Sequence, residues 1–240
     1  MNAAEQYQSE GCLVVESLLS SGHVSRLRAR MDEIANGATS YPADDIEFEP
    51  GGGAIRKINR CAENDGVFRA HAEHPAILDI VESLIGPDIK LFASQCFMKP
   101  PGGVEKPWHQ DSAYFCIEPM ELVTCWTALD EVTIENGGMW VIPGSQKNGL
   151  VEHGPWSLGD RVDKQAFPQE ESEQRPIEMP AGGCSFHHSM LLHRSGPNRT
   201  DQPRRGLAVH YMSAHSKWTD AANPQPEYPL LRGREYAGCV

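Results

Sequence analysis

After about residue 88, short apolar runs alternate with turn-forming residues. The runs are rich in β-branched and aromatic residues and read IKLFASQCFMKP, VTCWTALDEV, GMWVIPGS, CSFHHSMLLH and RGLAVHYMSA. Glycine, proline and asparagine separate them, which is typical of antiparallel strands joined by turns. The pattern predicts a mainly β fold in which two antiparallel sheets face each other, as in a jelly roll or cupin-like barrel.

The first third of the chain has a helical pattern instead. SSGHVSRLRARMDEIANG places Val24, Leu27, Met31 and Ile34 at helical spacing, and HPAILDIVESLIGPD repeats this pattern. Before them, GCLVVESLL predicts a short strand. We expect these N-terminal helices to flank the outside of the β core.

The length of 240 residues suits one domain with a large core. We expect a helical and strand N-terminal part at about 1–88, a jelly-roll core at about 89–216 and an irregular tail at 217–240. Residues 151–180 are polar and contain prolines. A loop of this length predicts either a lid over a binding site or a solvent-exposed insertion.

The charge and cysteine content restrict the partners and the compartment. The formal net charge is -12, and so acidic a surface repels nucleic acids and anionic membranes. Seven cysteines without a C-x-x-C pair argue against a disulfide framework. MNAAEQYQSEG lacks the features of a signal peptide, and no apolar run reaches the about 18 residues of a membrane span. We expect a cytoplasmic protein, a monomer or homodimer, that acts on a small molecule and binds neither nucleic acid nor membrane.

The segment WHQDS contains two candidate metal ligands, His109 and Asp111. On or beside a strand, side chains two residues apart point to the same face. With one histidine from a neighbouring strand they would form the two-histidine, one-carboxylate triad of non-haem Fe(II) oxygenases. The lack of a thiolate ligand argues against a structural zinc site.

Several downstream histidines compete for the third ligand position. The candidates are His153, His187, His188, His193, His210 and His215. We favour His193, because it ends the apolar strand SMLLH and enters the turn RSGPN, which would place it at the barrel mouth. His187 and His188 are adjacent, so at most one of them could face the cavity of a strand-built barrel.

An arginine beyond this turn could bind a co-substrate. An iron oxygenase of this type needs two electrons, which 2-oxoglutarate supplies, and the far carboxylate of 2-oxoglutarate needs a bidentate cation. Arg204 and Arg205 both lie early in the next strand. Arg204 shares a strand face with Gly206 and Ala208, which would leave room for a ligand, whereas Arg205 shares one with large aliphatic residues. We therefore choose Arg204.

Three segments resemble the phytanoyl-CoA dioxygenase family. They are WHQD, VTCWTALDEVTIENGGMWVIPGSQKNG and LLHRSGPNRTDQPRRGLAVHY. The resemblance implies an Fe(II)- and 2-oxoglutarate-dependent oxygenase on a double-stranded β-helix. The iron ligands of the family correspond to His109, Asp111 and His193. Its carboxylate-binding arginine corresponds to Arg204, eleven residues after the last histidine.

The resemblance also implies further contacts with 2-oxoglutarate. Trp126, Gln95 and Lys57 match positions beside the cofactor pocket, although an indole at position 126 could equally fill the core. The metal centre itself would carry the chemistry, with no separate acid or base. The expected reaction uses O2 to hydroxylate an unactivated C–H bond of a small molecule and releases succinate and CO2.

Other reactions remain alternatives. The same oxidant could desaturate, cyclise or epimerise a substrate. A related halogenase would have a small residue in place of Asp111, and a non-catalytic binding protein would be expected to lose one of His109, Asp111, His193 or Arg204. A zinc hydrolase with the same ligands would not need the arginine, and no extra general base is evident near WHQDS. The presence of all four residues favours hydroxylation, or one of these oxidative variants, over the halogenase, binding-protein and hydrolase alternatives.

Overall fold

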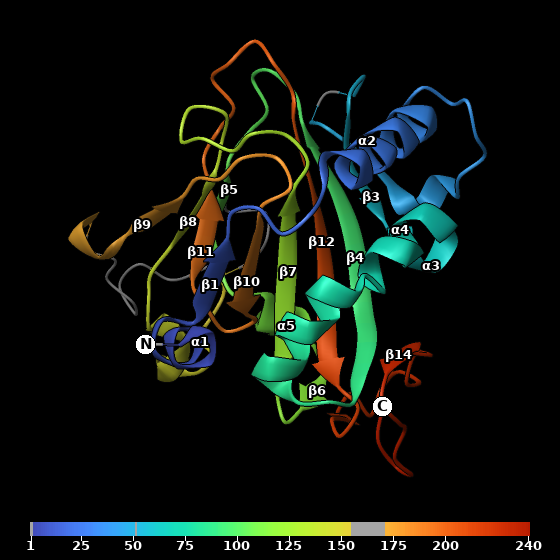
Figure 1. Ribbon diagram of the computed structural model, residues 1–240, viewed down its shortest axis with the longest axis vertical. Helices are drawn as coiled ribbons and strands as arrows, with labels where there is room; N and C mark the ends of the chain where they lie inside the picture. The colour runs from blue at the N-terminus through green and yellow to red at the C-terminus, as the bar shows by residue number, and fades with distance from the viewer. Residues whose placement is uncertain (1, 51, 155–170) are drawn as a thin grey trace.

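Two antiparallel sheets form the centre of the computed structural model, which describes residues 2–50, 52–154 and 171–240 (Figure 1). The large sheet has the order β1 (Cys12–Val15), β10 (Cys184–His188), β7 (Leu122–Ala128), β12 (Arg204–Ser213), β4 (Ile89–Lys99), β3 (Ile55–Asn59) and β2 (Ile46–Phe48), with β14 (Leu230–Arg232) also paired to β4. The small sheet has the order β5 (Lys106–His109), β11 (His193–Ser195), β8 (Met139–Val141) and β9 (Arg175–Ile177). Two short strands, β6 (Ile117–Glu118) and β13 (Lys217–Trp218), pair separately.

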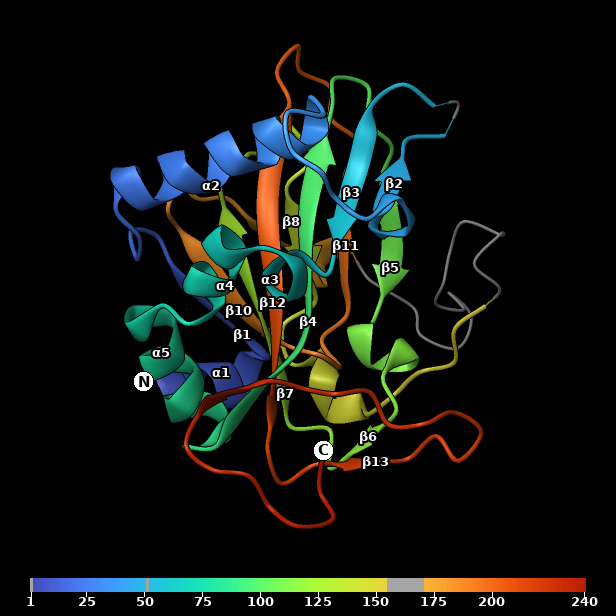
Figure 2. The same cartoon turned by 90° about the vertical axis from the view of Figure 1, so that its right-hand side faces the viewer.

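Helices cover the outer side of the large sheet (Figure 2). The α-helices are α1 (Ala3–Glu10), α2 (Ser21–Ala35), α3 (Cys61–Asn64), α4 (Gly66–Ala72) and α5 (Pro75–Ile85). Short 3-10 helices are η1 (Ala43–Asp45), η2 (Asp111–Tyr114), η3 (Ser145–Asn148) and η5 (Glu171–Glu173). The mainly β double-sheet fold with flanking N-terminal helices is therefore confirmed.

The two long helices form where the sequence pattern places them. The side chain of Ser20 caps the start of α2 by accepting a hydrogen bond from the backbone N–H of His23. The apolar residues at helical spacing in α2 are all buried, and so are Ile77 and Val81 of α5. The buried face of each helix thus packs on the sheet, and its exposed face remains polar.

The apolar run SMLLH is not a strand, contrary to the expectation from sequence. Strand β10 ends at His188, and β11 begins at His193. Between them a turn brings the N–H of Leu191 to the carbonyl of His188 at 2.8 Å. The chain crosses here from the large sheet to the small sheet, and the leucines are buried because the crossover passes through the core. His193 therefore starts a strand rather than ending one.

The ends of the expected loop and the tail contain more regular structure than the sequence indicates. Of the range 151–180, residues 155–170 lie outside the described residues, and the remainder includes η5 and β9. The expected irregular tail at 217–240 contributes β13 and β14. No helix in the described part of the chain is long and apolar enough to cross a membrane.

Candidate functional site

A cavity lies between the two sheets, and the centre of a water-sized sphere can move through about 130 Å³ of it. Both sheets contribute to its wall: β5, β8 and β11 of the small sheet, and β2, β3, β4, β7, β10 and β12 of the large sheet. The candidate residues named from the sequence line this cavity, namely His109, Asp111, His193, Arg204, Trp126, Gln95 and Lys57. The fold therefore brings together side chains from segments far apart in the chain.

His109 and His193 are direct neighbours across β5 and β11. Asp111 is the first residue of η2, just after β5, so the chain turn rather than strand alternation brings it to the same side. Oδ1 of Asp111 lies 3.7 Å from Nε2 of His109 and 3.6 Å from Nε2 of His193. One ligand atom from each of the three residues lies within 4.8 Å of the others, which suits a shared metal ion.

The outer nitrogens of both imidazoles are held by the backbone. Nδ1 of His109 lies 2.8 Å from the carbonyl oxygen of Pro107, and Nδ1 of His193 lies 2.9 Å from that of Leu191. This contact places the proton on Nδ1 and leaves the Nε2 lone pair facing the centre, as metal-binding histidines require. Nε2 of His109 is buried and has no hydrogen-bond partner among the described residues.

The protonation states also suit metal binding. Burial lowers the pKa of His193 to about 4 and lowers that of His109 well below its usual range, so both rings are neutral near pH 7. Burial alone would raise the pKa of Asp111, but the neighbouring His193 and His187 outweigh it and keep that pKa well below its usual range. Neutral imidazoles and an ionised carboxylate are the forms that bind a divalent cation.

The other oxygen of Asp111 faces a second polar group. Thr124 on β7 lies 3.1 Å from Oδ2 and also contacts Nδ1 of His210 at 2.8 Å. Nε2 of His187 lies 3.8 Å and Nδ1 of His210 lies 4.0 Å from the same Oδ2. Thr124 is in register with both histidines, one on each neighbouring strand.

Sequence reasoning missed this second group. It considered His187 and His210 only as candidates for the third ligand position. The alternation that selected Arg204 also puts His210 on the same face of β12, so that signal was present in the sequence. The adjacent His188 faces the other way, toward the ring of Tyr7.

The remaining candidate histidines lie away from the metal-ligand atoms. Nε2 of His153 accepts a hydrogen bond from the backbone N–H of Gln110, and His215 pairs with Asp88 at 3.6 Å.

The side chain of Gln110 forms hydrogen bonds with the backbone of Gly149, Val151 and Met190, so it fixes the loop behind the site.

Arg204 is buried in the cavity wall and has no acidic partner within residues 2–50, 52–154 and 171–240. The residue is 4% exposed, and its guanidinium carbon lies 5.3 Å from the ring centroid of Trp126. Nη2 donates to the carbonyl oxygen of Gly137 at 2.8 Å, whereas Nε has no hydrogen-bond partner among the described residues. Burial lowers the pKa of Arg204 to about 10, so the group remains charged at neutral pH. A buried cation of this kind is a ready partner for an anionic ligand.

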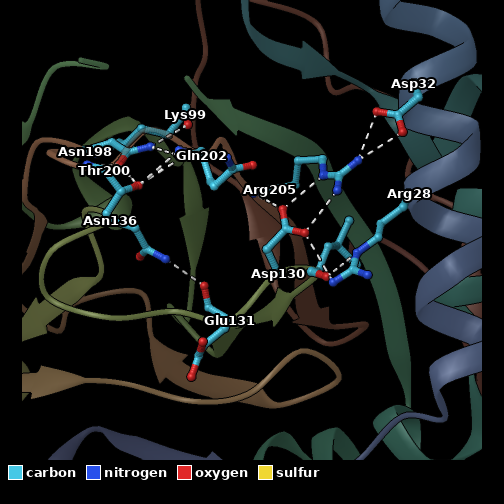
Figure 3. Close-up of polar contacts among 11 residues, drawn as sticks. Arg28, Asp32, Lys99, Asp130, Glu131, Asn136, Asn198, Thr200, Gln202 and Arg205 are labelled. Atoms are coloured by element: carbon cyan, nitrogen blue, oxygen red, sulfur yellow. Dashed lines mark hydrogen bonds and ion pairs between the residues drawn. The ribbon is translucent and has the colours of Figure 1, made fainter. Parts of the chain in front are cut away.

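Arg205 lies on the opposite face of β12, in a network of ion pairs (Figure 3). It contacts Asp130 at 2.9 Å and Asp32 of α2 at 3.0 Å, and Arg28 contacts the same Asp130 at 3.1 Å. These contacts tie α2 to the large sheet. The structure thus separates the two arginines, with one in the cavity and the other in an interface between elements.

Gly206, on the same face of β12 as Arg204, was expected to leave room for a ligand, but it makes room for a side chain instead. A Cβ at Gly206 would lie 2.1 Å from Cζ2 of Trp126. The space above Gly206 is therefore filled by the indole and not left for a ligand. Ala208, the next residue on the same face, does line the cavity.

Gln95 and Lys57 line the cavity from β4 and β3. Gln95 lies in register with Ala208 on β12. Nζ of Lys57 lies 3.3 Å from a carboxylate oxygen of Glu47, so this lysine already has an acidic partner.

The model of the phytanoyl-CoA dioxygenase family matches residues 7–206. The chain belongs to the phytanoyl-CoA dioxygenase family. It is 31% identical over 235 residues to a probable phytanoyl-CoA dioxygenase of Caenorhabditis elegans, with 87% of this chain and 75% of that protein aligned. It is 28% identical over 220 residues to a probable alpha-ketoglutarate-dependent hypophosphite dioxygenase of Stutzerimonas stutzeri, with 87% and 77% aligned.

Among solved structures, the apo form of the non-heme monooxygenase ThoJ has a TM-score of 0.84 at 25% identity, covering 100% of this chain and 86% of that one. Members of the phytanoyl-CoA dioxygenase family are non-haem dioxygenases that use iron, 2-oxoglutarate and O2. The expected enzyme class and cofactors are therefore confirmed.

Proposed function

We propose that His109, Asp111 and His193 are the iron ligands of this enzyme and that Arg204 binds the far carboxylate of 2-oxoglutarate. The observation that carries the proposal is the meeting of two oriented, neutral imidazoles and one ionised carboxylate in a cavity that also contains a buried guanidinium with no acidic partner among the described residues. When bound, iron and 2-oxoglutarate supply an oxidant from O2 that can hydroxylate an unactivated C–H bond, with succinate and CO2 as the other products.

The protein residues fix the geometry of this chemistry. The backbone carbonyls of Pro107 and Leu191 orient the two imidazoles, and Thr124 orients the carboxylate of Asp111. The indole of Trp126 lies beside the Arg204 guanidinium and holds it in the cavity wall. Gln95 and Lys57 complete the proposed 2-oxoglutarate pocket. Such preorganised positions let a metal centre react without a separate acid or base from the protein.

We propose a small molecule as the substrate and hydroxylation as the outcome. The candidate iron ligands and Arg204 line one cavity between the two sheets, which supports a small ligand bound beside the co-substrate. All seven cysteines are free thiols, which supports a reducing, cytoplasmic location. The large sheet joins strands from residue 12 to residue 232, which supports a single folded domain.

The proposed function predicts 2-oxoglutarate turnover. Purified protein should release labelled succinate from labelled 2-oxoglutarate only when Fe(II) and O2 are present, and a substrate from a metabolite panel should stimulate this release. Asp111→Ala should abolish succinate release because it removes an anionic iron ligand. Asp201→Ala removes an exposed carboxylate and should leave the release unchanged. Folded wild-type protein that releases no succinate under any of these conditions would contradict the proposal.

A further inference from the structure

A second cation lies next to Arg204 in the cavity. Lys99, the last residue of β4, is in direct register with Arg204, the first residue of β12. Both side chains line the cavity. Two positive charges on adjacent strands repel each other, and an anion bound between them would offset this repulsion.

Lys99 has only neutral partners in the described part of the chain. Its ammonium donates to the hydroxyl of Ser195 at 3.0 Å and to the carbonyl oxygen of Gly196. Ser195 is two residues after His193 on β11, so the ammonium lies close to the metal-ligand strand. No ion pair joins Lys99 or Arg204 to a described carboxylate, in contrast to Lys57, which pairs with Glu47.

Burial raises the free energy of the two charged side chains, Lys99 and Arg204, when no anion lies between them. Burial and the neighbouring Arg204 lower the pKa of Lys99 to about 7. The buried Nε of Arg204 has no partner among the described residues. A carboxylate bound between the two groups would supply that partner and would restore the charge of the lysine.

The backbone around Lys99 keeps its side chain in place. A Cβ at Gly103 would lie 2.8 Å from Cγ of Lys99, and a Cβ at Gly137 would lie 2.9 Å from its Cδ. Two glycines therefore let the backbone close tightly around the aliphatic stem. The ammonium is held toward Ser195 and the cavity instead of extending into solvent.

We propose that Lys99 is a second cation for the far carboxylate of 2-oxoglutarate, acting together with Arg204. This proposal rests on the proposed function, because it requires that 2-oxoglutarate occupies the cavity. The site would select a dicarboxylate 2-oxo acid over a 2-oxo acid that lacks the second carboxylate.

The test compares 2-oxoglutarate with pyruvate, which keeps the 2-oxo acid group but lacks the far carboxylate. Binding to the Fe(II)-loaded protein is measured without O2, by calorimetry and by the absorbance change on 2-oxo acid binding. In Lys99→Met the Kd for 2-oxoglutarate should rise about 10- to 100-fold, the size expected for a lost charge-assisted hydrogen bond. The Kd for pyruvate should stay within about threefold of wild type.

Two variants control for charge and packing. Lys217→Met removes an exposed lysine and should leave both Kd values unchanged. Lys99→Arg keeps the positive charge and should recover most of the 2-oxoglutarate affinity. An unchanged 2-oxoglutarate Kd in Lys99→Met, or an equal loss for both ligands, would overturn the proposal. If wild-type protein does not bind 2-oxoglutarate at all, the proposed function itself fails.

A measurement on wild-type protein tests the same point even if Lys99→Met does not fold. The charged groups that influence Lys99 are Arg204 on β12, Arg56 on β3, and Glu49 and Glu105 in loops. Above pH 7 the unliganded lysine loses its proton, so the affinity ratio of 2-oxoglutarate to pyruvate should fall by on the order of tenfold between pH 6.5 and 8.5. A constant ratio over this range would argue against Lys99 as a partner of the far carboxylate.

Discussion

At the scale of single residues, the two oxygens of Asp111 have different surroundings. Oδ1 faces the Nε2 atoms of His109 and His193, whereas Oδ2 accepts a hydrogen bond from Thr124. The carboxylate is thereby held with one oxygen toward the proposed metal position. Loss of a residue that orients a ligand in this way typically lowers metal affinity about 10- to 100-fold.

Thr124→Val should weaken iron binding while leaving the fold intact. Valine has nearly the same shape as threonine but cannot donate to Oδ2 of Asp111, so the carboxylate loses its fixed orientation. We expect the Kd for Fe(II) to rise about 10- to 100-fold, as measured by competition with a chelator. A variant that unfolds like wild type and binds iron as tightly would show that Thr124 does not position the ligand.

Arg204→Met should weaken 2-oxoglutarate binding, whereas Arg205→Met should lower the stability of the fold. Loss of Arg204 should raise the 2-oxoglutarate Kd by at least about 100-fold, because a bidentate partner is lost. Loss of Arg205 should leave that Kd unchanged and should lower the free energy of unfolding by on the order of 1 kcal/mol, because its ion pairs with Asp130 and Asp32 are half-buried. Calorimetric 2-oxoglutarate titrations and urea unfolding measure the two effects. A weaker 2-oxoglutarate affinity in Arg205→Met alone would contradict the assignment.

At the scale of elements, the site depends on how closely β7 and β12 approach each other. Trp126 on β7 covers Gly206 on β12, and the two strands are in register over most of their length. This contact places the indole against the Arg204 guanidinium. A small residue at position 206 is therefore a condition for the shape of the cavity wall.

Gly206→Ala should displace the indole of Trp126. The added Cβ would lie 2.1 Å from that ring, which is closer than any stable contact. We expect a loss of about 1–3 kcal/mol in the free energy of unfolding, together with weaker 2-oxoglutarate binding. Gly22→Ala in the first turn of α2 meets no atom within 4 Å, so it should leave stability unchanged or slightly raised. Chemical denaturation of both variants checks the prediction, and equal stabilities would refute it.

The crossover from β10 to β11 shows how one element boundary moves a functional residue. The sequence run that contains His193 reads as a continuous strand, yet its leucines form a buried turn between the sheets. Leu192 donates its N–H to the hydroxyl of Ser145, which anchors the turn to η3. As a consequence, His193 lies on the small sheet beside His109, whereas His187 remains on the large sheet.

At the scale of the whole molecule, the helical layer buries polar groups against the large sheet. His71 of α4 is fully buried, with Nε2 3.2 Å from the hydroxyl of Thr127 on β7 and Nδ1 3.1 Å from His23 of α2. Burial lowers the pKa of His71 to about 3. The packing of helices on the sheet therefore depends on a neutral histidine.

Because His71 is buried in its neutral form, we expect the protein to lose stability in acid. Between pH 6.5 and 3 the unfolded chain protonates position 71 and the folded chain does not, so stability falls as the pH falls through that window. Each such group contributes up to about 1.4 kcal/mol per pH unit. Urea unfolding of iron-free protein at several pH values should show a shallower slope for His71→Gln than for wild type. Identical slopes for wild type and His71→Gln would contradict this account.

The fold class, the enzyme class and a short set of candidate residues can be predicted from the sequence. Strand and helix periodicity is a local property, so it can be read without knowing which strands pair. His109 and Asp111 are two residues apart, and the spacing from His193 to Arg204 is set by one turn, so local geometry also restricts these positions.

Which distant residues share the cavity depends on how the two sheets pack in three dimensions. Lys99, Thr124, His187 and His210 come from four different strands, and their meeting depends on strand order and register. The sequence pattern does not specify which strands are neighbours, because every apolar run can pair with several others. The second cation beside Arg204 and the polar group behind Asp111 therefore follow from the packing of the two sheets.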